Sequence, residues 1–337
     1  MYKYLAISIL FLMHLNAQDI NESTATFFDD CKTTEYALGN ITVCGEVETE
    51  ISIELSTLPL RSFPFKEVKQ ISTDKKRFIG SYFVTGYSLY DIIANVKIKK
   101  VNEEEFRPPV DIYVIVENEE GEKAVFSWGE LFYSKDNFKS IITKSIAPIN
   151  PSKGKMEWPV SESTRLICGY DMTNERFISN PTKITLKSAP GEYSKERMEN
   201  IFSSEIKVIK DDTEIAITEI GDKIRKISFE HIGYGHGRGF KGISQKEGFL
   251  LKDILNNVLT FYSNDLRSSL LIVSAKDGYR VTYSLAEIIN RNDLEDFLLF
   301  DCGEATDAGR FTSFTTADFF VDRNVRSIEK IEIIEIK

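Results

Sequence analysis

The sequence predicts an α+β, mostly β protein built from two tandem copies of one unit. The strand candidates are short and alternate apolar with polar residues, which is typical of half-buried strands. The helix candidates are few and short, which argues against a doubly wound sheet. A series of motifs also recurs in the same order in both halves of the chain, and 337 residues suffice for two domains.

The clearest repeat is the stretch Asp277–Ile288, DGYRVTYSLAEI. It predicts a strand over Arg280–Ser284 that enters a short helix at Leu285. An imperfect copy occupies residues 121–131. Equivalent residues are separated by a constant 157 positions: Gly121 and Gly278, Ser127 and Ser284, Glu130 and Glu287.

Further repeats keep the same order along the chain. Residues 49–53 return as 213–217, 86–93 as 248–255, 112–116 as 269–273, Arg165-Leu166 as Arg310-Phe311, and 176–186 as 323–333. Chance matches would not stay collinear, so the pattern predicts a tandem duplication. We expect a first domain over residues 19–188, a linker over 189–204 that begins with Ala-Pro-Gly, and a second domain over 205–337.

Residues 1–18 have the pattern of a signal peptide. Lys3 precedes an apolar run from Tyr4 to Leu15, which is too short to span a bilayer, and Asn16-Ala17-Gln18 is a plausible processing site. The pattern predicts a periplasmic or secreted protein with no membrane span after cleavage. An uncleaved anchor is the alternative.

The charge and the cysteines restrict the class of protein. The net charge is −10 at pH 7 and the basic residues are not clustered, which disfavours nucleic-acid binding. The four cysteines, Cys31, Cys44, Cys168 and Cys302, have no CxxC spacing and fit no zinc pattern. A disulfide between Cys31 and Cys44 and four free thiols both remain open.

The most unusual stretch is residues 231–239, HIGYGHGRG. Its glycines free backbone N–H groups to converge on an anion, and an arginine fork binds phosphate in a bidentate manner. The predicted anion- or cofactor-binding residues here are His231, Gly235, His236, Gly237 and Arg238. Two alternatives stay open: a glycine-rich hairpin or bulge, and a metal held by the two histidines.

Several arginines of the second copy form another candidate set. Arg280 and Arg323 are predicted to line a cofactor pocket, together with Asp277, Arg310 and Arg326. Their counterparts in the first copy would be Glu120, Lys123, Arg165, Arg176 and Ser179. Salt bridges and strand edges are the alternative. The chain has no GxSxG and no HExxH motif, so we predict no catalytic residue.

The ordered motifs resemble the oxidoreductase molybdopterin-binding domain family, whose fold is that of sulfite oxidase. The second copy carries the resemblance best, in the segments Phe240–Gly242, Leu251–Leu255, Asp277–Ile288, Leu298-Leu299 and Arg323–Ile333. The resemblance implies two divergent domains of this fold, with molybdopterin as the cofactor of the family.

One departure from the family bears on function. In catalytic members a cysteine thiolate that precedes the DGY strand binds molybdenum, but here no cysteine lies between Cys168 and Cys302. Cys44 lies in the opening strand, where the family has no ligand. We therefore expect a non-catalytic module without a cofactor that binds a small anionic ligand or a protein. The alternatives are a divergent molybdopterin-dependent oxidoreductase that uses residues 231–238, and a structural domain of an exported assembly.

Overall fold

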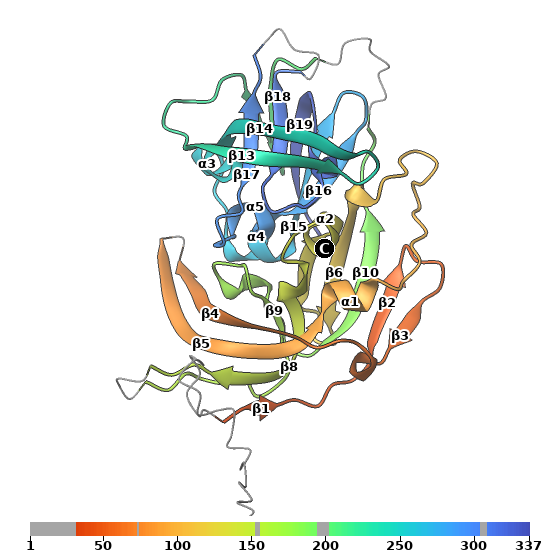
Figure 1. Cartoon of the computed structure of the whole chain (residues 1–337), viewed down its shortest axis with the longest axis vertical. Helices are drawn as coiled ribbons and strands as arrows, with labels where there is room; N and C mark the ends of the chain where they lie inside the picture. Colours follow the sequence, from red (N-terminus) through yellow and green to blue (C-terminus); the bar gives the residue numbers. More distant parts are fainter. Residues whose placement is uncertain (1–31, 73, 152–155, 194–201, 304–308) are drawn as a thin grey trace, which may run out of the picture.

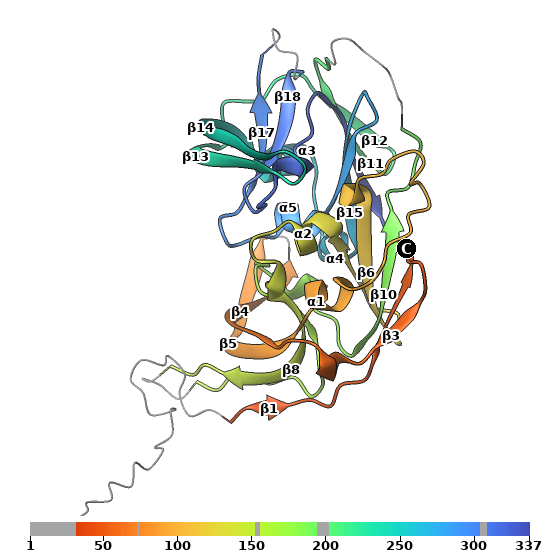
Figure 2. The ribbon, with the colours of Figure 1, turned by 45° about the vertical axis from the view of Figure 1, so that its right-hand side comes forward.

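The computed structural model describes residues 32–72, 74–151, 156–193, 202–303 and 309–337. The expected signal peptide, Cys31 and half of the expected linker lie outside these residues. Figures 1 and 2 show the first half of the chain in red to green and the second half, from teal to blue, beside it.

The first half of the chain forms two sheets. One has the strand order β3-β2-β10-β6-β7, and the other has the order β1-β8-β5-β4 with β9 paired to β8. The strands are β1 (Thr34–Glu35), β2 (Ile41–Gly45), β3 (Ile51–Ile53), β4 (Arg61–Ser72), β5 (Lys75–Ser88), β6 (Ile112–Asn118), β7 (Lys123–Ser127), β8 (Ser140–Pro148), β9 (Leu166–Cys168) and β10 (Pro181–Ser188). The helical segments are η2 (Leu55–Thr57), α1 (Leu89–Ile93), η3 (Pro109–Asp111), α2 (Trp128–Phe132), η4 (Asn137–Lys139) and η5 (Asn174–Arg176).

The second half also forms two sheets. Their strand orders are β12-β11-β19-β15-β16 and β13-β14-β17-β18. The strands are β11 (Ile206–Lys210), β12 (Thr213–Ile217), β13 (Lys226–Gly235), β14 (Gly239–Leu250), β15 (Ser269–Ala275), β16 (Arg280–Ser284), β17 (Phe297–Asp301), β18 (Phe311–Thr315) and β19 (Ile328–Glu335). The helical segments are α3 (Leu251–Val258), α4 (Ser263–Ser268), α5 (Leu285–Ile289) and η6 (Val321–Arg323).

The two halves share one topology. Each has one parallel strand pair, β2 with β10 and β11 with β19, and the other pairs are antiparallel. Even the register repeats, since Val43 faces Ile184 and Val208 faces Ile331. The prediction of a mostly β chain with few short helices is confirmed.

The register corrects one of the predicted correspondences. Leu166 N donates to Ile178 O at 2.9 Å, and Ser313 N donates to Val325 O at the same distance. The counterpart of Leu166 is therefore Ser313, and the counterpart of Arg165 is Thr312. The predicted match of Arg165-Leu166 with Arg310-Phe311 is wrong by two residues. Because side chains on a strand alternate with a period of two, such a shift preserves the apolar pattern and escapes detection from the sequence.

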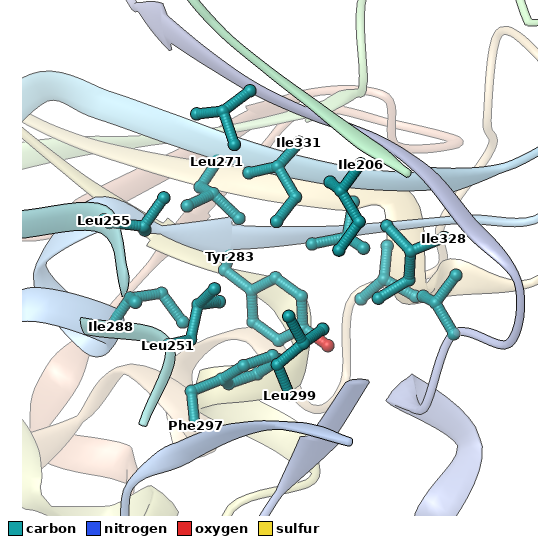
Figure 3. Close-up of a cluster of buried hydrophobic side chains, with 14 of the residues drawn as sticks. Ile206, Leu251, Leu255, Leu271, Tyr283, Ile288, Phe297, Leu299, Ile328 and Ile331 are labelled. Carbon is teal, nitrogen blue, oxygen red and sulfur yellow. The ribbon is translucent and has the colours of Figure 1, made fainter. Parts of the chain in front are cut away.

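Each half has its own apolar core, and a third cluster joins the halves. Figure 3 shows the core of the second half, where Tyr283 lies among Leu271, Phe297 and Ile331. The intervening positions of β15, Leu270 and Ile272, are equally buried, because they pack on the other face of the sheet. There they meet three side chains of the first half: Tyr113, Ile115 and Val125. The central strands are therefore covered on both faces.

Two short helices begin at this contact, and the serine that caps each helix also bonds a carboxylate of the other. Ser127 Oγ caps α2 by accepting the N–H of Glu130 at 2.9 Å, and Ser284 Oγ caps α5 by accepting the N–H of Glu287 at 3.1 Å. Each hydroxyl then donates to the carboxylate of the other helix. Ser127 bonds Glu287 at 2.9 Å, and Ser284 bonds Glu130 at 2.9 Å.

One buried arginine from each half completes this network. Arg323 lies 2.7 Å from Glu287 and 2.6 Å from Asp318, and it also donates to Ser127 at 3.1 Å. Arg176 makes the equivalent contacts with Glu130, Asp171 and Ser284, at 2.7, 2.7 and 3.1 Å. Both guanidinium groups are almost completely excluded from solvent. The charges are tolerated there because every arginine is paired and hydrogen-bonded.

The two glutamates of the network differ in protonation. Burial raises the pKa of Glu287 to about 8, and the charge of Arg323 offsets only part of this effect, since the carboxylates of Glu130 and Asp318 raise the pKa further. Burial also opposes the ionisation of Glu130, but Arg176 donates two N–H groups to it, and the pKa of Glu130 is lowered overall. As the pH falls, Glu287 therefore takes up a proton before Glu130 does.

Removing one of the shared serines should cost more than removing an ordinary cap. Ser88 caps α1 and bonds only Asp91 of its own helix, so Ser88→Ala should lower the free energy of unfolding by about 1 kcal/mol. Ser127→Ala should cost roughly 2–3 kcal/mol, because Glu287 and Arg323 each lose a buried partner. Urea unfolding measures both values. Equal losses of unfolding free energy in Ser88→Ala and Ser127→Ala would show that the bonds of Ser127 to the second half do not contribute.

Stability should depend on pH through Glu287. The folded state holds this proton more tightly than the unfolded state, so its contribution is fully present below about pH 4.5 and is lost as the pH rises towards 8. Glu287→Gln, which keeps the size and an acceptor oxygen, should remove that part of the decline. The difference in urea unfolding free energy between the two proteins from pH 5 to 8.5 isolates it. A constant difference would refute the assignment.

Candidate functional site

The glycine-rich stretch is the tip of a β-hairpin. It forms the end of β13, the turn, and the start of β14, with an irregularity in the register after Gly233. Gly239 and Gly242 have φ values of 69° and 118°, a region in which side chains other than glycine are strained. Of the alternatives raised by the sequence, the hairpin with a bulge is what these residues form.

The inner face of this hairpin changes character along its length. Phe229 and His231 point inward on β13, but the next inward positions are Gly233 and Gly235. A Cβ atom at Gly235 would lie only 2.7 Å from Cε of Lys241, so the glycine leaves space for the stem of that lysine. The missing side chains leave room beneath the hairpin tip.

A cavity of about 590 Å³ lies at this place. Its lining includes four cationic side chains and an imidazole: Arg238, Lys241, Lys246, Arg326 and His231. The described lining contains no Asp or Glu, and none of the four cations pairs with a carboxylate in the part of the chain that the structure describes. In a chain of net charge −10, this local excess of positive charge favours an anion.

The first half contains an equivalent hairpin, β4–β5, which serves as an internal comparison. There Phe65 faces Tyr82 and Phe63 faces Val84, with a bulge after Glu67. In the second half, His231 faces Ser244 and Phe229 faces Lys246, with a bulge after Gly233. The equivalent positions are therefore Phe65 and His231, Tyr82 and Ser244, Val84 and Lys246, and Glu67 and Gly233.

In the first half the corresponding space is filled. Glu67 accepts hydrogen bonds from Arg165 at 2.9 and 3.0 Å and from Asn174 at 2.7 Å. Phe65 stacks on Tyr82 beside this ion pair, with ring centroids 5.5 Å apart. The counterparts of Glu67, Arg165 and Asn174 are Gly233, Thr312 and Val321, and all three line the cavity. The cavity thus occupies the place of a buried ion pair.

The structure brings together some of the predicted site residues. His231, Arg238 and Arg326 line the cavity, while Gly235 lies at the start of the turn and Gly237 within it. His236 does not join them. Its backbone N–H donates to Asp322 at 2.8 Å, and its ring packs edge-on against Phe320 at 5.1 Å.

Arg280 and Arg323 do not lie in this cavity, and the prediction that they share a pocket with Arg326 is wrong. Arg323 belongs to the buried network between the halves, as described above. Arg280 is 1% exposed and is bound by Asp111 at 3.2 Å and Glu105 at 3.0 Å, both from the first half. Salt bridges, the alternative reading of these arginines, account for both.

Lys241 and Lys246 also line the cavity, although the sequence did not predict them as site residues. A signal for Lys246 was present, because the spacing of 162 residues that relates the motifs at 86 and 248 also aligns Val84 with Lys246. A buried apolar position that becomes lysine in the second copy marks a change of environment. The signal becomes evident only when strand pairing shows that Val84 faces the first-half core.

The cysteines occupy three different environments. Cys44 Sγ lies 3.4 Å from Thr185 Oγ1 within a sheet. Cys168 is fully buried, and burial raises the pKa of its thiol well above the usual value. Cys302 is exposed and lines the cationic cavity.

Metal binding by His231 and His236 finds no support. Among the described residues, no group of three or more His, Cys, Asp and Glu side chains is arranged to hold a metal ion. None of the helices in the described part of the chain has the length and apolar character to cross a membrane.

Comparisons with known proteins do not assign the chain to a family. No protein-family model matches the chain, and a search of curated proteins finds no relative.

Anion binding in this cavity should strengthen as the pH falls. Burial, together with Lys246 and Lys135, lowers the pKa of His231 below its usual 6.5, so the imidazole is uncharged at neutral pH. Protonation would add a positive charge beside the bound anion. Calorimetric titration with sulfate, whose charge is constant between pH 5 and 8, should show tighter binding at low pH. His231→Gln should flatten this dependence, and an unchanged dependence would exclude His231 from the site.

Proposed function

We propose that this protein is an exported, non-catalytic ligand-binding module that holds a small anion beneath the β13–β14 hairpin. The observation that carries the proposal is the cavity lined by Arg238, Lys241, Lys246 and Arg326 with no described carboxylate. Four like charges around one space repel one another, and a bound anion relieves this repulsion.

The comparison between the halves indicates that the basic lining of the cavity did not arise by chance loss of side chains. A cavity left by chance loss of side chains would keep an apolar lining, as in an emptied core. Here Val84 and Phe65 of the first half correspond to Lys246 and His231. Basic side chains in place of core side chains, at two positions of one face, are what anion binding requires.

We propose further that each half is a divergent domain of the molybdopterin-binding family with the sulfite-oxidase type of fold. The motifs that carry this resemblance fall on equivalent elements: the short helices α1 and α3, the strands β7 and β16, and the closing strands β10 and β19. Export rests on the sequence pattern of residues 1–18.

The second candidate is a divergent molybdopterin-dependent oxidoreductase, and one observation favours it. Cys302 lines the same cavity as the four cations, so a thiol and a set of phosphate-binding side chains are adjacent. The cations would hold the phosphate of the pterin and Cys302 would face its metal, which supplies the redox chemistry when bound. Cys168 is too deeply buried for this role.

Isothermal titration calorimetry with inorganic phosphate at low ionic strength tests the leading proposal. Binding should weaken as salt is added, and Lys246→Val, which restores the first-half residue type, should weaken it roughly tenfold. Lys66→Val is the matched control, because Lys66 is exposed on the equivalent hairpin of the first half. Absence of binding, or equal affinity in the wild type and Lys246→Val, would refute the proposal.

Elemental analysis of protein from its native host separates the two candidates. The leading proposal expects phosphate binding without molybdenum. Molybdenum near one atom per chain that is lost in Cys302→Ser would establish the second candidate instead.

A further inference from the structure

We infer that the natural ligand is an amphiphilic anion, with a phosphate- or sulfonate-like group joined to an apolar, preferably aromatic, part. This inference rests on the proposed anion site and specifies the chemical class of its ligand. The charged group would occupy the cationic cavity, and the apolar part would occupy a second cavity beside it.

The second cavity lies along the same hairpin and measures about 560 Å³. It is lined mainly by apolar and aromatic side chains: Ile227, Phe229, Ile232, Tyr234, Phe314 and Phe319. Its character thus differs from that of the cationic cavity, although β13 contributes to both. Ligand pockets commonly combine an apolar wall with a few charged groups that fix orientation.

His231 and Phe314 join the two cavities, because both residues line both spaces. Their rings meet edge to face with centroids 4.6 Å apart. A ligand that passes over this pair would place its two ends in spaces of opposite character. One extended molecule therefore fits the arrangement better than two separate small ligands.

The carboxylates around the apolar cavity are paired with basic side chains, one of which, Lys135, also lines the cavity, with one exception. Asp318 lies 2.6 Å from Arg323, and Glu295 lies 3.4 Å from Lys135. Asp296 is paired with Lys252. Glu230, the exception, is an exposed residue of β13 and remains accessible to water. An apolar group in this cavity would consequently meet little unpaired charge.

Several large apolar side chains of this cavity are exposed in the absence of a ligand. Ile232 is 63% exposed, Phe319 58% and Tyr234 41%. In the first half the position of Ile232 is occupied by Lys66, so the apolar character is specific to the second half. Covering these side chains would add about 25 cal/mol for each Å² of apolar surface removed from water.

Calorimetry on the full chain with inorganic phosphate, phenyl phosphate and phenol at constant ionic strength tests this inference. Phenyl phosphate should bind at least about tenfold more tightly than inorganic phosphate, because the ring gains apolar contacts. Phenol, which lacks the charge, should bind more weakly than phenyl phosphate.

Two substitutions at exposed positions locate the apolar part. Phe319→Ser should reduce the affinity for phenyl phosphate to nearly that for inorganic phosphate and leave the latter unchanged. Phe240→Ser is the matched control, since Phe240 is 64% exposed on the same hairpin and lines neither cavity. It should leave both affinities unchanged.

The outcomes separate this inference from the proposed function. Equal affinities for the two phosphates, or a gain that survives Phe319→Ser, would overturn the amphiphilic ligand while the anion site stands. Phenol binding as tightly as phenyl phosphate would also overturn it. If neither phosphate binds, the anion site and the inference both fail.

Discussion

The structure depends on the burial of two arginines where its halves meet. Arg176 and Arg323 are each paired with carboxylates of their own half. Each also donates a hydrogen bond to the capping serine of the other half, so part of the polar network is satisfied only when the two halves meet. The same contact fixes where α2 and α5 begin, because their capping serines bond across it. It thereby also fixes the end of β16, which leads directly into α5.

The two halves share one backbone plan but differ in their side chains. Beneath the β4–β5 hairpin, the ion pair of Glu67 with Arg165 and the aromatic stack exclude solvent. Beneath the β13–β14 hairpin, small and basic residues at the same positions leave an open, positively charged space. Different side chains on the same strand register therefore give a packed interior in one half and a cationic cavity in the other.

The class of fold could be predicted from the sequence, but the pairing between distant residues could not. The alternation of apolar and polar residues predicts the strands, and the collinear spacing relates Ser127 to Ser284. A capping pattern is local, however, and does not show that each serine also bonds the carboxylate of the other helix. The glycine-rich stretch predicts His231 and Arg238, whereas Lys246 is recognised only from strand pairing. Arg280 and Arg323 resemble pocket residues in the sequence because most of their partners, such as Asp111 and Glu287, lie far away along the chain.

The reciprocal bonds of Ser127 with Glu287 and of Ser284 with Glu130 have the geometry of a twofold-symmetric dimer contact, in which each partner offers the other the same group. Here both partners belong to one chain. A homodimer must carry every pocket twice, because one gene encodes both copies. The two halves of one chain are free of that constraint, so the β4–β5 hairpin covers an apolar core while the β13–β14 hairpin covers a cationic cavity. The asymmetry of the two hairpins is thus possible because both halves belong to one chain.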